Sequence, residues 1–158
     1  MKTDFRALFT VALAGLLTFA GAGCSAQAKK DRHLAAADKA YAAGLYDQAE
    51  IEYKNVLQLG GITPHAIGQL GLIYYAQGRL GRAVPFLRKG HELEPDNLEL
   101  RLKLGIVALA GGKLDEAREA AETVLGHQPE NDEAIMLLVD TARKPEDIAK
   151  ARQLLQHL

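Results

Sequence analysis

Five histidines and one cysteine are the side chains of this sequence best suited to metal binding or catalysis. The histidines are spread along the whole chain, at His33, His65, His91, His127 and His157. No two of them stand four residues apart, the spacing at which one helix face presents a pair of zinc ligands. His91-Glu92 is not followed by a second histidine at the metalloprotease spacing. The pattern therefore predicts no metal site.

Motifs of nucleophilic and phosphate chemistry are also missing from the sequence. It contains no G-x-S-x-G motif and no glycine-rich phosphate loop, and Cys24 has no histidine beside it to form a dyad. Helix ends and solvent account for carboxylates such as Glu92, Glu94 and Asp96. We therefore expect no enzymatic activity, no catalytic residue and no cofactor.

The composition indicates a folded, helical protein without affinity for nucleic acid. Hydrophobic residues make up 48% of the 158 residues and charged residues 25%, a balance that excludes a disordered chain. With 19 basic and 20 acidic residues, the net charge of −1 provides no positive field to attract nucleic acid. Tryptophan is absent and aromatic residues make up only 6%, whereas alanine and leucine abound, which favours helices over strands.

The N-terminal segment, 1–23, has the pattern of a secretory signal peptide. Lys2 and Arg6 form a short basic start, and residues 7–23 then carry no charge and end in small residues. The alternative is a transmembrane anchor, but its glycines make this segment a poor membrane helix. We therefore expect export from the cytoplasm.

The single cysteine stands where the small residues end, in Gly21-Ala22-Gly23-Cys24-Ser25. This stretch resembles a bacterial lipobox, in which the cysteine is acylated and becomes the mature N-terminus; Gly21 departs from the leucine that is usual there. Ser25 resembles the residue that directs lipoproteins to the outer membrane. The resemblance implies a lipid anchor on Cys24, a linker over residues 24–29 and a location on the periplasmic side of the bacterial cell envelope.

A constant sequence period organises the rest of the chain. Three sets of residues carry this period: alanines, glycines that stand five residues before three of these alanines, and the residues that close the units. These are Ala49, Ala83, Ala117 and Ala151, then Gly44, Gly78 and Gly112, and finally Pro95 and Pro129 with Gly61 in the equivalent place. Such a period predicts stacked units of one supersecondary motif, with boundaries at 30–63, 64–97, 98–131 and 132–158.

Each unit is predicted to be a pair of helices. In the second unit Thr63 is a candidate N-cap, and Pro64 suits the first helical position. In the first unit Asp47 and Glu50 have the spacing of a capping box.

The second helix of the second unit is predicted over residues 81–93, which places Pro85 in its first turn, where no intrahelical donor is lost. Small residues are expected where the two helices of a unit cross, since the backbones approach closely there. The predicted crossing residues are Ala37, Ala49, Ala83, Ala117, Ala151, Gly71 and Gly105.

This pattern resembles the tetratricopeptide repeat. The likeness rests in the second unit on Leu70-Gly71, Tyr74, Gly78, Ala83, Leu87 and Pro95, and in the third on Leu104-Gly105, Gly112, Ala117 and Pro129. It covers residues 30–158. It implies an all-α solenoid of about four helical hairpins in a right-handed superhelical arc, acting as a scaffold for other proteins.

The resemblance also implies a partner-binding groove formed by the first helix of each unit. Its positions correspond to Leu34, Asp38, Tyr41, Gln69, Leu72, Tyr75, Leu102, Lys103, Ile106, Leu109, Met136, Asp140 and Arg143. A groove of this kind suits an amphipathic helix or an extended apolar segment of another protein. The family's clamp for chaperone tails requires lysine and asparagine at set groove positions. Leu34 and Asp38 occupy the first two of these positions, so we expect this specificity to be absent.

These observations predict an exported, lipid-anchored scaffold that holds another envelope protein. Two alternatives follow from the end of the chain, where Ile148, Leu154, Leu155 and Leu158 would leave an apolar face uncovered. The protein would then be a self-associating structural module or the N-terminal fragment of a longer repeat protein. A catalytic alternative needs a pair of carboxylates in the groove, for which Asp38 and Asp140 are the candidates.

Overall fold

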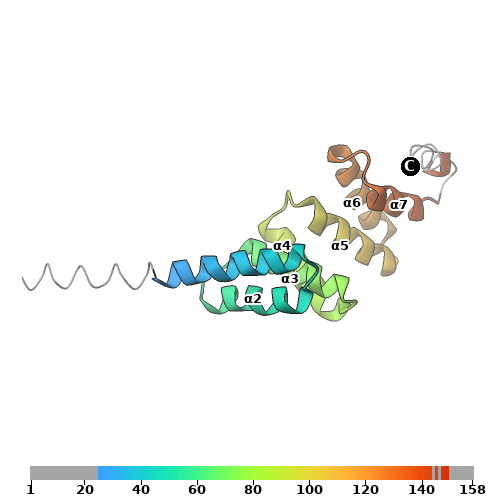
Figure 1. Cartoon of the computed structure of the whole chain (residues 1–158). Coiled ribbons are helices and arrows are strands. Elements are labelled where there is room, and N and C mark those ends of the chain that lie inside the picture. The colour runs from blue at the N-terminus through green and yellow to red at the C-terminus, as the bar shows by residue number, and fades with distance from the viewer. Residues whose placement is uncertain (1–24, 144, 146, 150–158) are drawn as a thin grey trace, which may run out of the picture. The chain divides into compact units, whose positions relative to one another are not determined.

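A computed structural model describes residues 25–143, 145 and 147–149 of the chain. These residues form α-helices joined by short turns, and they include no strand (Figure 1). The expected all-α repeat fold is thereby confirmed. The chain divides into two compact units, Met1–Ile62 and Thr63–Leu158.

The first unit contains one helical hairpin. A helix over residues 25–42 is followed by α2, Tyr46–Gln58. His33 Nδ1 lies 2.5 Å from Glu52 Oε2 in α2, and Lys30 Nζ donates to the Gly60 carbonyl oxygen at 3.1 Å. The first helix thus contacts the middle of α2 and the turn that follows α2.

The second unit contains the remaining helices of the described chain. They are α3 (Pro64–Ala76), α4 (Leu80–Leu93), α5 (Leu98–Ala110), α6 (Leu114–His127) and α7 (Asp132–Asp140). α3 packs on α4, α5 on α6, and α6 on α7, while α5 also contacts α3, α4 and α7. The first helices of successive repeats, α3, α5 and α7, therefore lie next to one another in order.

The periodic turn glycines end the first helix of each hairpin. Gly44, Gly78 and Gly112 have φ angles of 71°, 70° and 76°, a left-handed conformation that only glycine adopts without strain. After α3, the Gly78 amide donates to the Tyr75 carbonyl at 2.9 Å and the Arg79 amide to the Tyr74 carbonyl at 2.8 Å. This pair of bonds is the Schellman motif, which satisfies the last carbonyls of a helix.

Asparagines begin two of the helices. Asn97 Oδ1 accepts from the Leu100 amide at 3.2 Å, and Asn131 Oδ1 accepts from the Ala134 amide at 2.9 Å. Thr63, which holds the same place before α3, makes no such bond, and its hydroxyl oxygen is buried without a hydrogen-bond partner among the described residues. The prediction that Thr63 caps α3 with its side chain was therefore wrong, whereas Pro64 does stand at the first helical position.

The start of α2 differs from the predicted capping box. The helix begins at Tyr46 with Leu45 as its N-cap, so Asp47 lies inside the first turn and is not the capping residue. Glu50 is buried and pairs with Lys54 one turn further along the same helix.

Pro85 was also placed incorrectly. Because α4 begins at Leu80, Pro85 is the sixth helical residue and lies in the second turn. There the Gly81 carbonyl would otherwise accept from the amide of residue 85, which proline lacks. Gly81 is exposed, so its carbonyl can bond to water instead.

Small residues permit the close helix crossings of both units. Ala37, Ala49, Ala83 and Ala117 are fully buried. A Cβ atom added to Gly71 would lie 2.7 Å from the Leu87 backbone nitrogen in α4. A Cβ added to Gly105 would lie 2.6 Å from the Ala120 Cβ in α6. Real Cβ atoms essentially never come this close to another atom, so both positions require glycine at the present spacing of the helices.

Candidate interaction surface

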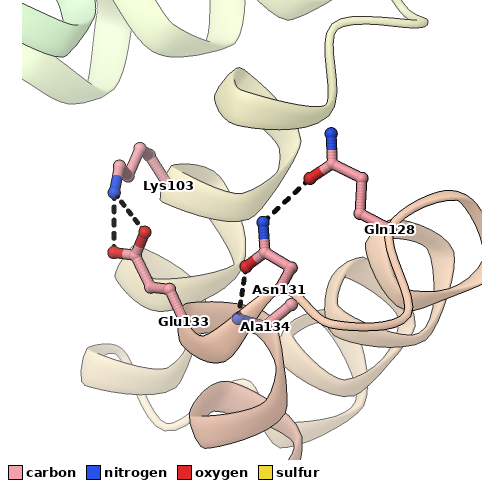
Figure 2. A network of polar contacts seen from close by, with 5 residues as sticks. All are labelled: Lys103, Gln128, Asn131, Glu133 and Ala134. Carbon is pink, nitrogen blue, oxygen red and sulfur yellow. Dashed lines mark hydrogen bonds and ion pairs between the residues drawn. The ribbon is translucent and has the colours of Figure 1, made fainter.

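Three side chains connect the first helices of the second unit. Lys103 of α5 donates from Nζ to both carboxylate oxygens of Glu133 in α7, each at 2.6 Å (Figure 2). The same Nζ lies 5.4 Å from the centre of the Tyr75 ring in α3, within the range of a cation–π contact. The Lys103 side chain is 18% exposed and that of Glu133 46%. The lysine is thus held from both sides, whereas the glutamate faces solvent in part.

The position of Glu133 follows from the start of α7. Asn131 caps this helix through its side-chain oxygen, and its side-chain amide donates to Gln128 Oε1 at 2.8 Å (Figure 2). These two bonds fix the first turn of α7, which carries Glu133 towards Lys103. Glu133 is not among the groove residues predicted from the sequence. It belongs to the repeat after that of Lys103, so no local sequence pattern signals the contact.

Apolar side chains accompany this contact on the same helices. Ile106 and Leu109 of α5 are partly buried, and Met136 of α7 is 49% exposed. Both α5 residues also pack against the core cluster formed by α5, α6 and α7. We call the accessible positions of the three helices the α3–α5–α7 surface, and define it as Tyr75, Lys103, Ile106, Leu109, Glu133 and Met136.

Two of the predicted groove residues lie in the core. Leu72 and Leu102 are each 4% exposed, and Leu102 belongs to the core cluster. They therefore offer almost no area to a partner. Gln69 is partly buried, and its side-chain oxygen has no hydrogen-bond partner among the described residues.

The last two predicted groove residues lie at the end of α7. Asp140 and Arg143 are both exposed. Arg143 Nη1 donates to the carbonyl oxygens of Asp140, at 3.0 Å, and Ala142, at 2.9 Å. The guanidinium therefore satisfies the carbonyl of the last residue of α7, as is typical of basic residues near a helix end, and that of Ala142 just beyond it.

The predicted groove residues of the first unit stabilise their own hairpin. Asp38 is exposed, yet its Oδ1 accepts from the Tyr53 hydroxyl of α2 at 2.6 Å. The pKa of Tyr53 lies well above its ordinary value. Burial of the side chain is the largest cause, and this hydrogen bond is the second. Tyr41 is partly buried, with its ring centre 5.8 Å from that of Tyr46. Leu34 is also partly buried.

Several predicted residues lie outside the described part of the chain. They are Cys24, Ala151, Leu154, Leu155 and Leu158. The predicted signal peptide, residues 1–23, also lies outside the described residues. Among the residues that are described, no helix is both long and apolar enough to cross a membrane. Nor do the described residues contain a group of three or more histidine, cysteine, aspartate or glutamate side chains that could hold a metal ion.

Comparison with protein families gives matches along almost all of the helical chain. Two models described as "Tetratricopeptide repeat" match it, one at residues 34–97 and the other at residues 74–126 and 108–158. Among curated proteins, DnaJ homolog subfamily C member 3 of Bos taurus is 31% identical over 117 residues, or 74% of this chain. The match spans 23% of that relative, so the chain corresponds to about a quarter of its length.

Solved structures of similar fold agree with these matches. The crystal structure of YrrB, described as a TPR protein with an unusual peptide-binding site, has a TM-score of 0.61 at 22% identity. The match covers 78% of this chain and 64% of YrrB. The O-GlcNAc transferase of Thermobaculum terrenum has a TM-score of 0.67 at 22% identity, over 84% of this chain and 26% of the transferase. At 22% identity, these similarities show a shared fold and nothing further.

Proposed function

The chain belongs to the tetratricopeptide repeat family, and from this premise we propose that it is an exported, lipid-anchored scaffold that holds another protein of the bacterial envelope. A repeat fold of this family suggests protein–protein interaction. The observation that carries the proposal is the α3–α5–α7 surface, where apolar side chains and one internally satisfied ion pair lie on three neighbouring helices.

The apolar part of this surface selects the kind of partner. Met136 exposes about half of its side chain, and Ile106 and Leu109 offer part of theirs. Burying such side chains against a partner removes apolar area from water, which stabilises a complex. An amphipathic helix or an extended apolar segment has the shape and chemistry to do so. YrrB, of similar fold, is described as having a peptide-binding site.

The charged part of the surface acts against acidic partners. Lys103 already donates to both oxygens of Glu133. A carboxylate of a partner would have to displace Glu133, which would leave a charge of the scaffold without its counterion. We therefore expect recognition to depend on apolar contacts.

The sequence before residue 25 supports the envelope location in our proposal. It combines the basic start, the uncharged segment 7–23 and Cys24 at its end. A single acyl chain binds a membrane only marginally, and stable anchoring requires more than one. A lipidated N-terminal cysteine carries more than one acyl chain. An anchor of this kind would concentrate the scaffold at one membrane, where its effective concentration towards an envelope partner is high.

Affinity purification of the tagged, full-length protein from detergent-solubilised envelopes of its host tests the scaffold. A Met136→Asp variant should lose a stoichiometric partner, with binding weakened about tenfold or more. Leu80→Asp is the matched control, because Leu80 is 47% exposed but belongs to α4. Equal recovery of the partner with both variants would contradict the proposal.

The anchor needs a separate test. Cells fed a labelled fatty acid should incorporate it into the native protein and not into a Cys24→Ser variant. An unlabelled native protein that fractionates like the variant would exclude the anchor and leave the scaffold proposal standing.

Self-association is a second candidate, favoured by Ile148, which is 50% exposed near the end of the described chain. Light scattering of the protein over a range of concentrations tests it. A mass that stays monomeric throughout would exclude this candidate.

A further inference from the structure

The sulfur-containing side chains of the sequence are Met1, Cys24 and Met136. Met1 belongs to the predicted signal peptide and Cys24 to the predicted anchor, so within residues 30–158 Met136 is the one side chain that contains sulfur. It lies in the middle of α7 and is 49% exposed. The thioether of methionine is oxidised to a polar sulfoxide. Met136 therefore offers its sulfur to an oxidant dissolved in the surrounding water.

Met136 differs from the residue that holds its place one repeat earlier. Leu102 of α5 stands there; it contains no sulfur, is 4% exposed and belongs to the core cluster. Leu137 and Leu138, which follow Met136 in α7, are buried in the same cluster. Oxidation at Met136 therefore acts on the α3–α5–α7 surface and not on the buried members of this cluster.

Two exposed aspartates flank Met136 on α7. Asp132 stands four residues before it and Asp140 four residues after it, and residues at this spacing are neighbours on a helix surface. Hydrogen peroxide carries no charge, so these carboxylates do not repel it. Ionised carboxylates only accept hydrogen bonds. The aspartates cannot donate to a sulfoxide oxygen between them, and that oxygen is left to water.

We propose that Met136 is a site of reversible oxidation by peroxide, and that its oxidation weakens partner binding at the α3–α5–α7 surface. The inference rests on the proposed scaffold function. The sulfur attacks one oxygen of hydrogen peroxide, and a sulfur–oxygen bond forms as the oxygen–oxygen bond breaks. The hydroxide that leaves takes the proton of the transferred hydroxyl group and becomes water. The sulfur is thereby oxidised and the peroxide reduced.

The sulfoxide disfavours the kind of partner that the surface selects. An apolar segment that covers Met136 has to remove water from the new oxygen and supplies no donor in return. A buried acceptor without a donor is costly, since it has lost its hydrogen bonds to water. Ile106 and Leu109 contain no sulfur and keep their part of the apolar contact, so oxidation should weaken the complex about tenfold rather than abolish it.

Peptide mapping by mass spectrometry tests the modification site. The full-length protein from host cells exposed to hydrogen peroxide should carry one added oxygen on Met136. Methionine sulfoxide reductases, one for each epimer, should remove this oxygen from the purified protein. A Met136 side chain that stays unoxidised in the cells, while the urea-unfolded protein reacts with the same peroxide, would overturn the site.

Recovery of the partner from detergent-solubilised envelopes tests the effect on binding. Peroxide treatment of the tagged, full-length protein should lower the recovery about tenfold, and the reductases should restore it. Met136→Leu has no sulfur at this position, so its own recovery should be equal before and after peroxide. The double variant Met136→Leu, Leu80→Met moves the sulfur to a position of α4 that is 47% exposed in the wild type. Its oxidation should not change the recovery.

The outcomes separate this inference from the scaffold proposal. Equal recovery by oxidised and untreated wild type would overturn the effect on binding and leave the scaffold standing. An equal loss in peroxide-treated Met136→Leu would overturn it as well, because the damage would then lie elsewhere. A wild type that recovers no partner before treatment would contradict the scaffold and, with it, the control of binding. Peptide mapping decides the oxidation site in every case.

Discussion

Lys103 of α5 donates hydrogen bonds to both carboxylate oxygens of Glu133 in α7. The lysine that the sequence offered as a contact for a partner is thus already bound within the chain. The pair connects the first helices of two successive repeats and neutralises the middle of the α3–α5–α7 surface. It combines a structural role with an influence on which partners can bind.

A double-mutant cycle measures the strength of this pair. We expect the single variants Lys103→Met and Glu133→Gln and their combination to give a coupling free energy of about 0.5–1 kcal/mol in urea unfolding. The value is small because Glu133 is nearly half exposed, and it should decrease in high salt. A coupling free energy of zero in dilute buffer would show that the pair stabilises nothing.

The glycine at the crossing of α3 and α4 should tolerate no side chain. Gly71→Ala brings a Cβ to 2.7 Å from the Leu87 backbone nitrogen, so the helices must move apart, at a cost of about 1–3 kcal/mol. Gly126→Ala is the matched control. Apart from its chain neighbours and its own helix backbone, no described atom lies within 4 Å of its added Cβ, and the substitution should stabilise α6 by about 0.5–1 kcal/mol. Chemical denaturation of the two variants should therefore give shifts of opposite sign.

The asparagine caps should contribute measurably to stability. Asn97→Ala and Asn131→Ala each remove a hydrogen bond to the first turn of a helix and should cost about 1 kcal/mol of unfolding free energy. Thr63→Ala should cost less, because the Thr63 hydroxyl caps nothing and is buried without a partner among the described residues. Thermal unfolding can compare all three, and a larger loss for Thr63→Ala would reveal a bond that the structure does not contain.

The Tyr53 hydroxyl group, which joins the two helices of the first unit, should also contribute to stability. Tyr53→Phe removes its bond to Asp38 and should lower the unfolding free energy by about 1–2 kcal/mol. Asp38 is exposed and regains water, which limits the loss. Urea denaturation followed by circular dichroism measures the change, with Tyr41→Phe as a comparison at a partly buried tyrosine.

Acidification should destabilise the second unit through His91. In the folded state the pKa of His91 lies below its ordinary value of 6.5. Burial of the imidazole is the larger cause, and the positive charge of Arg101 is the second. Glu116 and Glu119 of α6 line the same open pocket as His91 and Arg101. As the pH falls through 6.5 the unfolded chain binds a proton that the folded chain does not, so stability decreases.

The difference in unfolding free energy between the wild type and His91→Gln isolates this effect. This difference should be constant above about pH 7. As the pH falls towards about 5, the wild type should lose stability relative to His91→Gln. A difference independent of pH over this range would show that His91 has its ordinary pKa in the folded protein.

Local conformation was the part of the fold best predicted from sequence. Gly78 and Gly112 recur at one step, and each takes the left-handed conformation that ends a helix. The second helix of the second unit was predicted over residues 81–93 and runs from Leu80 to Leu93. Pro85 lies beyond the first turn with either start, so its predicted position was wrong independently of this boundary. Asn97 and Asn131, which cap α5 and α7, also stand one repeat apart, although the predicted period did not include them.

The accessible surface was harder to predict, because it depends on contacts between repeats. Leu72 and Ile106 hold equivalent positions in two successive repeats, yet Leu72 is 4% exposed and Ile106 is only partly buried. The packing of neighbouring helices decides this difference. The contact between Lys103 and Glu133 likewise requires two side chains from different repeats to extend towards each other. No pattern within one repeat encodes it.

The repeated helix signals also bear on how such a chain evolves. Residues 98–131 contain the glycine that ends α5, Gly112, and are bounded by two equivalent caps, Asn97 before them and Asn131 at their end. Each repeat of this design therefore specifies where its own helices start and stop. A tandem duplication of the codons for this segment would insert a hairpin whose faces match the neighbours on both sides. Selection could thus change the length of the binding surface in whole repeats, without first having to invent a new fold.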